Sequence, residues 1–197
     1  MTVIDLGQIY NGPYATFLMA MAGARVIKIE PVGGEKMRRR GTVGGAMLPF
    51  AMLNSNKEFV TLNLKSKDGV ELLKKMVAKA DVLLENFAPG AMDRLGLGYD
   101  VIREINPGIV YASGTGYGSF GPSKDMLAMD LTIQAMSGVM ASTGFQDRPP
   151  VKAAPHCATS SVASISMAQS SPLSTRRQRP VRDRMSKCRC WSRFIPH

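Results

Sequence analysis

The amino-acid composition of this chain changes abruptly near Pro155, and the change limits which residues can share a folded core. From His156 to His197 there is no Gly, one Leu and one acidic residue, but all three Cys and the only Trp. A segment with so few large apolar residues buries too little surface to offset the entropy cost of ordering it. We therefore expect one domain over residues 1–154 and a basic tail over residues 155–197 that is mostly irregular and poorly packed.

Most of the chain's net charge of +10 lies in this tail, which has eight basic residues against one acid, so the first 155 residues carry only +3. An Arg-rich tail leaves a nucleic-acid-binding module as an alternative function. The body gives that alternative little support, and we expect no nucleic-acid partner.

No apolar run approaches the roughly 18 residues of a membrane span. Met1 leads straight into a strand-like run rather than a signal peptide. A body without Cys fits a reducing compartment, so we expect a cytoplasmic protein without a membrane partner.

The body alternates between strand and helix patterns. Val3–Leu6 is a short apolar run, Pro13–Ala24 has Pro in its first turn and Gly near its end, and Arg25–Glu30 alternates apolar and charged residues. This β-α-β pattern continues with strands expected over 58–64, 81–85 and 108–113, and helices over 66–79, 89–95, 99–105 and 127–140, the last expected to be well buried. It predicts an α/β fold with a Rossmann-like, mostly parallel sheet and helices on both faces.

A glycine-rich sequence, Gly114-Thr115-Gly116-Tyr117-Gly118, follows one of these strands. The dinucleotide fingerprint needs a third Gly or Ala at position 119, where this chain has Ser. A flexible loop at the carboxyl end of a strand is where α/β proteins commonly bind ligands. A dinucleotide-dependent oxidoreductase therefore stays an alternative, although the glycine spacing argues against it.

The body contains neither His nor Cys. A Ser-His-Asp triad, a cysteine nucleophile and a typical zinc site are therefore excluded within it, and the sequence offers no metal ligands there. Arg38-Arg39-Arg40 can hold phosphates, since guanidinium groups pair bidentately with them, or can belong to a solvated loop. Asn86-Phe87, directly after a strand, offers an amide and an aromatic face that suit a purine, or an ordinary turn.

Taken in order, the motifs of the body resemble one family. They are Val3–Gly7, Gly12-Pro13, Gly23–Pro31, Asn56-Lys57, Ala80–Val82, Glu85–Gly90, Asp93–Gly96, Asn106-Pro107, Gly114-x-Gly116 with Gly121-Pro122, and Gln134–Gly138. They resemble the family III CoA-transferases, which include formyl-CoA transferase, carnitine CoA-transferase and the related α-methylacyl-CoA racemases. The resemblance runs from Val3 to about Ala153, so the sheet and its domain are expected to be incomplete.

The resemblance implies an acyl-CoA as substrate, with no permanently bound cofactor, a carboxylic acid as acceptor, and an interlocked homodimer in the intact family. By motif position it implies CoA contacts at Ile9, Arg38, Leu62, Asn86, Phe87 and Arg94. The two arginines would serve the phosphates, and Phe87 and Leu62 would flank the adenine. At Met129 the racemases carry a catalytic His, so the resemblance favours a transferase. Some transferases have Gln where this chain has Tyr10, which leaves the acceptor open.

The aspartate that the resemblance implies as nucleophile is missing. In the family it follows a turn like Pro149–Lys152, yet this chain has no acidic residue between Asp147 and Asp183. We expect a frameshift near residues 153–155. Read one base out of register, the allowed codons from Cys157 onward permit a D-F-x-G-G sequence like the family's own. A genuine basic arm is the alternative. No catalytic residue is therefore assigned, and the chain is expected to be inactive as it stands.

Overall fold

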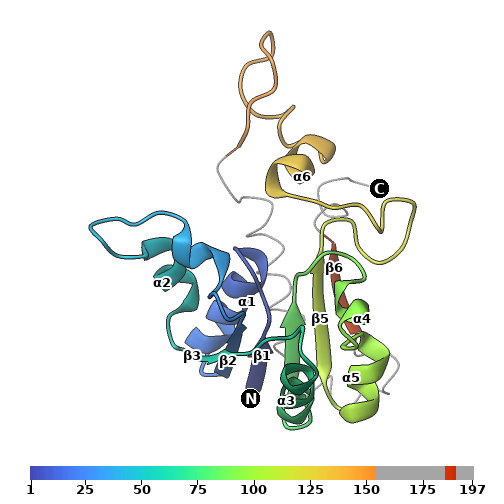
Figure 1. Cartoon of the computed structure of the whole chain (residues 1–197). Coiled ribbons are helices and arrows are strands. Elements are labelled where there is room, and N and C mark those ends of the chain that lie inside the picture. The colour runs from blue at the N-terminus through green and yellow to red at the C-terminus, as the bar shows by residue number, and fades with distance from the viewer. Residues whose placement is uncertain (154–184, 190–197) are drawn as a thin grey trace.

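The computed structural model of the protein describes residues 1–153 and the backbone of one further strand. Six parallel strands form one sheet in the order β3-β2-β1-β4-β5-β6 (Figure 1). This order is the usual one for doubly wound nucleotide-binding sheets, and it confirms the predicted α/β fold. The strands are β1 (Thr2–Asp5), β2 (Arg25–Glu30), β3 (Lys57–Thr61), β4 (Val82–Glu85), β5 (Val110–Thr115) and β6 (Met185–Arg189).

Helices cover both faces of the sheet, as predicted. On one face α1 packs Ala15 and Met19 against Val3 and Val82. On the other face α3 and α5 bury a larger core around Ile4. The helices are α1 (Asn11–Met21), α2 (Leu48–Asn54), α3 (Lys67–Val77), α4 (Ala91–Arg94), α5 (Tyr99–Ile105) and α6 (Asp130–Met136), with a 3₁₀ helix η1 (Lys36–Arg39).

Local signals account for the ends of the best-predicted helices. The Ser66 hydroxyl accepts a hydrogen bond from the backbone N–H of Gly69 and so caps α3. Gly23, just past the end of α1, adopts φ +88°, a conformation that side chains other than glycine rarely take. The chain therefore turns directly from α1 into β2.

The predicted helix over residues 127–140 is wrong in length and in burial. Helix α6 ends at Met136, and Gly138 follows at φ +77°. Leu131 and Met136 are about half exposed, and only Ile133 and Gln134 are buried. The helix lies beyond the carboxyl ends of the strands rather than on a face of the sheet (Figure 1). Apolar residues around most of a helix indicate that it tends to be buried, but they do not specify which surface covers it.

Three further elements were not predicted. One is the short 3₁₀ helix η1, which has a single turn. Helix α2 begins near Pro49, which stands in its first turn, and its short apolar run carries too little periodicity to be recognised. Strand β6 lies within the tail that was expected to be mostly irregular, and it pairs with β5 from Tyr111↔Met185 to Thr115↔Arg189. The rest of the tail, 154–184 and 190–197, lies outside the described residues, so the expected boundary at residue 154 stays a prediction.

Candidate functional site

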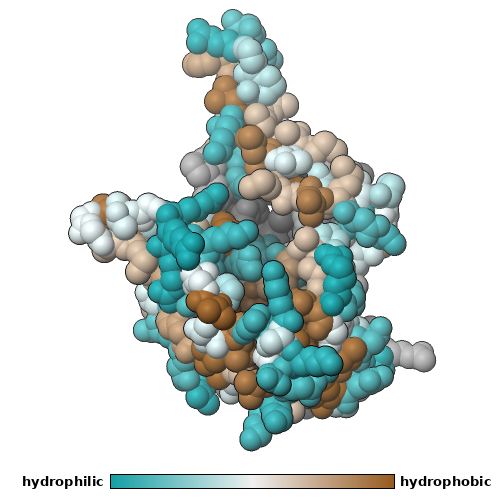
Figure 2. Space-filling view, viewed as in Figure 1, coloured by the Kyte–Doolittle hydropathy of each residue, from teal (hydrophilic) through white to brown (hydrophobic). Residues whose placement is uncertain are grey.

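A cavity of about 270 Å³ lies where the order of the strands reverses, between the carboxyl ends of β1 and β4. Ligands of open α/β sheets commonly bind at this point. The surface is hollowed here, between α6 and the edge of the sheet (Figure 2). We call it the switch-point cavity; it is lined by Gln8, Ile9, Tyr10, Asn11, Arg40, Asn86, Gly114, Thr115, Gly116, Ala128, Met129, Asp130 and Ile133.

Beside it, an apolar groove of about 200 Å³ crosses the carboxyl ends of β1, β2 and β3. Leu62 and Leu64 come from the segment after β3, and Phe87 and Leu95 border the other side. All four side chains are only partly buried and pack against the main core. The groove therefore offers apolar surfaces on two sides with an open mouth, a shape suited to a flat aromatic ring.

The groove opens into a basic hollow of about 430 Å³. Its cations come from the segment before α3, from both ends of α3 and from the end of α4. Its acidic residue, Glu71, lies 3.0 Å from the Lys74 ammonium. Because positive charge gathers here beside the amino end of α3, the hollow favours anions such as phosphate. We define the basic hollow by Leu64, Lys65, Ser66, Lys67, Val70, Glu71, Lys74, Arg94, Leu95 and Gly96.

The three sites share lining residues and so form one path. Gln8 lines both the switch-point cavity and the apolar groove. Lys65 and Leu95 line both the groove and the basic hollow. A ligand with an anionic end, a flat ring and a long arm can therefore extend along the carboxyl edge of the sheet, from the basic hollow to the cavity.

The loop between β1 and α1, which borders both cavity and groove, is held by side chains from elsewhere in the fold. The Asn86 amide accepts from the Gln8 N–H at 2.6 Å and donates to the Gln8 carbonyl at 2.9 Å. A Glu35 carboxylate oxygen accepts from the Ile9 N–H at 2.9 Å. Ile9 has φ +63°, which is strained for a β-branched residue. These contacts offset the strain and fix the Ile9 side chain at the cavity wall.

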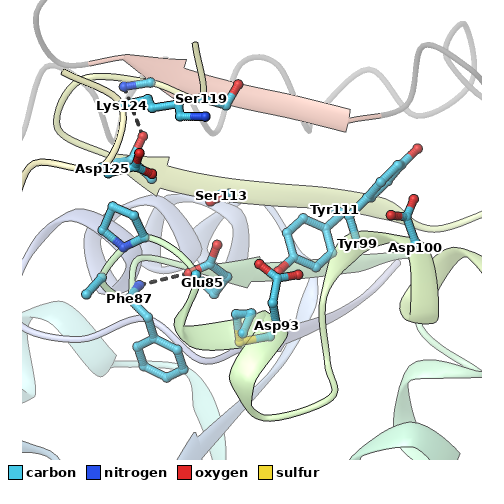
Figure 3. Close-up of a pocket in the computed structure, with 16 residues that line it drawn as sticks. Glu85, Phe87, Asp93, Tyr99, Asp100, Tyr111, Ser113, Ser119, Lys124 and Asp125 are labelled. Atoms are coloured by element: carbon cyan, nitrogen blue, oxygen red, sulfur yellow. Dashed lines mark hydrogen bonds between the residues drawn. The ribbon is translucent and has the colours of Figure 1, made fainter. Parts of the chain in front are cut away.

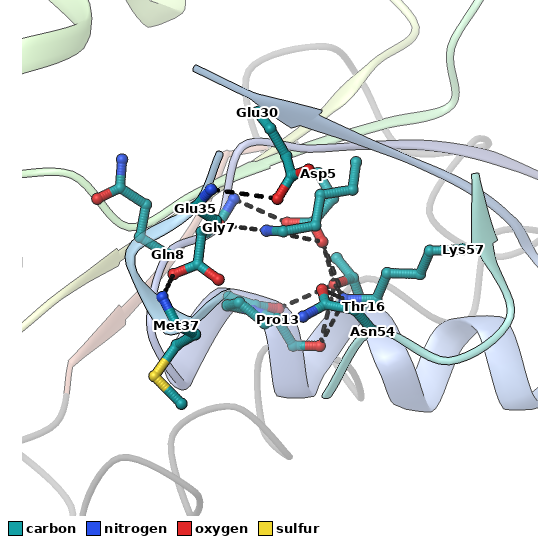
Figure 4. A network of polar contacts seen from close by, with 12 residues as sticks. Asp5, Gly7, Gln8, Pro13, Thr16, Glu30, Glu35, Met37, Asn54 and Lys57 are labelled. Atoms are coloured by element: carbon teal, nitrogen blue, oxygen red, sulfur yellow. Dashed lines mark hydrogen bonds and ion pairs between the residues drawn. The ribbon is translucent and has the colours of Figure 1, made fainter. Parts of the chain in front are cut away.

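A buried ion cluster supports the same loop from below (Figure 4). Asp5, Lys28 and Lys57 have no exposed side-chain surface, and the Lys57 ammonium lies 3.0 Å from the Asp5 carboxylate. The Lys28 ammonium donates to the Gly7 carbonyl at 2.6 Å, and the Lys57 ammonium donates to the Pro13 carbonyl at 2.9 Å. Each end of the loop is thus held by a hydrogen bond from a buried lysine side chain.

Burial and charge act in opposite directions on these groups. Burial lowers the pKa of the Lys57 ammonium to about 8, although Asp5 opposes the shift. Burial alone would raise the pKa of the Asp5 carboxyl, but Lys28 and Lys57 together hold it below its ordinary value. At neutral pH the Asp5 carboxyl and the Lys57 amine are therefore both charged.

Arg38 is occupied within the protein. Its guanidinium group donates to both carboxylate oxygens of Glu30, at 2.8 and 2.9 Å, and lies 3.9 Å from the centre of the Phe50 ring. It lines neither the cavity, the groove nor the basic hollow. Its predicted contact with a phosphate stays a prediction, and such a contact would compete with Glu30.

A fourth hollow, on the other side of β4, is acidic (Figure 3). Glu85, Asp93, Asp100 and Asp125 line it, with Lys124 as its basic residue. Burial, together with Glu85 and Asp93, raises the pKa of Tyr111 well above its usual range. A group of carboxylates repels phosphates, so this hollow does not suit an anionic ligand.

The structure brings five of the six sequence-predicted contact residues onto one path. Ile9 and Asn86 line the cavity, Leu62 and Phe87 line the groove, and Arg94 lines the basic hollow. Sequence reasoning missed the lysines of the hollow and the place of Arg40 in the cavity. The Lys65-Ser66-Lys67 sequence at a helix start is the signal that points to the lysines.

Within residues 1–153, no group of three or more His, Cys, Asp or Glu side chains is arranged to hold a metal ion. In the same part of the chain, no helix has the length and apolarity needed to cross a membrane.

Several curated relatives match this sequence over about three quarters of its length. An acetyl-CoA:oxalate CoA-transferase of Acetobacter aceti is 48% identical over 152 residues, which cover 76% of this chain and 39% of that protein. A formyl-CoA:oxalate CoA-transferase of Streptomyces avermitilis is 46% identical over 151 residues, covering 76% and 37%. Human succinyl-CoA:glutarate CoA-transferase is 39% identical over 153 residues, covering 76% and 35%. The chain thus spans less than two fifths of the length of these relatives.

Solved structures of similar proteins have the same fold as this chain. A CAIB/BAIF family protein from Brucella suis has a TM-score of 0.90 at 31% identity, covering 98% of this chain and 53% of that one. The protein Rv3272 from Mycobacterium tuberculosis has a TM-score of 0.83 at 30% identity, covering 90% and 50%. The model of the family described as CoA-transferase family III matches residues 1–178, past the expected boundary at residue 154. This match covers most of the chain and agrees with its doubly wound sheet, so the chain belongs to CoA-transferase family III.

Proposed function

We propose that this chain binds the CoA part of an acyl-CoA along the path described above, for transfer of CoA between an acyl-CoA and a carboxylic acid. The observation that carries the proposal is the continuity of the apolar groove with the basic hollow through Lys65 and Leu95. An adenine ring needs apolar faces, and the phosphates attached to its ribose need cations beside it. The apolar groove supplies the apolar faces, and the basic hollow beside it supplies the cations.

In this proposal the adenine lies between Leu62 and Phe87. Lys65 and Arg94 bind phosphate groups in the basic hollow. The pantetheine arm passes Gln8 and Asn86, which line the cavity beside the groove, and the thioester reaches the switch-point cavity. Of the predicted contacts, only Arg38 has no place on this route, because its guanidinium group is paired with Glu30.

The chemical step in the family depends on an aspartate, as the resemblance implies. Its carboxylate attacks the acyl carbonyl and expels CoA as the thiolate, which leaves a mixed anhydride. The thiolate then attacks the aspartyl carbonyl, which forms an aspartyl-CoA thioester and releases the donor acid as its carboxylate. No acidic residue stands between Asp147 and Asp183. We therefore propose that the chain retains CoA binding but does not complete the transfer. The homodimer and the cytoplasmic location stay predictions that rest on the resemblance.

Calorimetric titration of the full chain with CoA tests the proposal. We expect saturable binding that weakens at least tenfold in the double variant Lys65→Ala with Arg94→Ala. Lys75→Ala with Lys79→Ala is the matched control, because it also removes two positive charges, from exposed residues near the end of α3 that do not line the basic hollow. This control should leave the affinity unchanged. Unchanged affinity in Lys65→Ala with Arg94→Ala, or an equal loss in the control, contradicts the assigned path.

A further inference from the structure

Three consecutive arginines follow Met37, and their guanidinium groups have different surroundings. Arg38 is paired with Glu30. The Arg39 guanidinium donates to the Gly33 carbonyl at 3.0 Å, on the exposed side of the loop. Arg40 lines the switch-point cavity. Among residues 1–153 no carboxylate lies within ion-pair distance of it. Of the three, Arg40 is therefore the one placed to meet an anion in the cavity.

The other charged residue of the cavity wall is Asp130, at the start of α6. One of its carboxylate oxygens accepts a hydrogen bond from the Gln134 amide at 2.6 Å, which holds the acid against its own helix. Tyr10 and Asn11 add a hydroxyl and an amide on the same wall. The cavity wall thus carries one guanidinium and, at the start of α6, one carboxylate that already accepts from Gln134. The guanidinium can bind a ligand carboxylate with two parallel hydrogen bonds.

An acceptor acid changes charge during CoA transfer, and this bears on what Arg40 selects. The carboxylate that receives CoA becomes a neutral thioester. A monocarboxylic acid therefore leaves no negative charge in the cavity, whereas a dicarboxylic acid keeps one. A cation in the cavity wall favours the acid that stays charged, before and after the transfer.

We propose that Arg40 binds the distal carboxylate of the acceptor and thereby selects dicarboxylic over monocarboxylic acids. The inference rests on the proposed function, because it requires the thioester end of CoA to reach the switch-point cavity. Arg40 acts here as a specificity-determining residue. It takes no part in bond formation.

The test uses the full chain saturated with CoA and titrated calorimetrically with succinate or with butyrate, two acids of equal carbon number. We expect succinate to bind at least tenfold more tightly than butyrate. Arg40→Ala should remove this preference while keeping the urea midpoint of the unmodified chain, which shows that the variant is folded. Arg39→Ala is the matched control, since it deletes the neighbouring charge outside the cavity and should keep the preference.

Three outcomes overturn the inference: equal affinity for the two acids in the unmodified chain, an unchanged preference in Arg40→Ala, or an equal loss in Arg39→Ala. Lack of saturable succinate binding while CoA binds normally overturns it as well. If CoA itself does not bind, the proposed function fails, and the inference fails with it. The CoA titration therefore separates the two failures.

Discussion

The Lys57 ammonium lies 3.0 Å from the Asp5 carboxylate in a site that no solvent reaches. Replacing Asp5 by Asn keeps the side chain's shape but leaves two buried ammonium groups, on Lys28 and Lys57, without their carboxylate. Removing one partner of a buried ion pair typically costs about 3–5 kcal/mol. We expect Asp5→Asn to lower the free energy of unfolding by this amount in urea titrations.

The exposed ion pair between Arg25 and Glu58 is the matched control for that prediction. Its closest atoms are 2.8 Å apart, but both side chains are more than half exposed. Water and salt screen such a pair, so Glu58→Gln should leave the urea midpoint unchanged within error. Equal midpoints for Asp5→Asn and Glu58→Gln would show that the buried cluster contributes no more than a surface pair.

The stability of the domain should also depend on pH through Lys57. Burial lowers the pKa of its ammonium to about 8 from 10.5. The unfolded chain therefore holds this proton more tightly than the folded one, and raising the pH favours the folded state. Integration of the proton linkage gives a gain of about 2 kcal/mol between pH 7 and pH 9.5. Urea unfolding at these two pH values measures it.

Lys57→Met should lack this gain, and a variant with the same pH dependence as the unmodified protein would contradict the assignment. If the variant does not fold, an NMR titration of the lysine side chains in the unmodified protein gives the pKa directly. Measurements should stay below pH 10, because burial raises the pKa of Tyr111 above its ordinary value. Above that pH the Tyr111 hydroxyl loses its proton more readily in the unfolded chain than in the folded one, which favours unfolding.

Gly12 should be intolerant of any side chain. A Cβ atom there would lie 2.5 Å from the Cα atom of Gly7, which is backbone and cannot move aside. We expect Gly12→Ala to disturb the loop that borders the cavity, lowering the urea midpoint and weakening CoA binding together. Gly33→Ala is the control, because its added Cβ would meet only the mobile end of Arg39 at 3.4 Å. Normal binding by Gly12→Ala would show that the loop tolerates a shift.

The sequence predicted best the bounds of helices and strands that depend on residues nearby along the chain. The bounds of β2 and α5 agree with the predicted ranges, and Ser66 caps α3 as expected. In these segments hydrophobic period, capping and glycine conformation all depend on neighbours along the chain. Five of the residues that the resemblance implied as CoA contacts line the candidate path, and their contact with CoA stays a prediction.

What sequence did not predict depends on distant partners. Arg38 was expected at a phosphate, but Glu30 and Phe50 occupy its guanidinium group. Nothing near Lys57 in the sequence indicates a buried ammonium, because Asp5 lies 52 residues away along the chain. The exposure of α6 is a third case, since an apolar composition does not specify the surface that covers it.

The gene provides the last prediction. The absence of acidic residues from 148 to 182 coincides with the change of composition near Pro155, and a one-base shift in reading frame explains both. We expect that inserting or deleting one base near codon 154 restores an open frame containing D-F-x-G-G. Sequencing codons 145–165 and translating the alternative frame checks this. The chain as written should give no CoA transfer in an acyl-CoA assay, while the frame-restored protein should be active. An alternative frame interrupted by stop codons would contradict the shift, and turnover by homogeneous protein of the present sequence would show that another group replaces the aspartate.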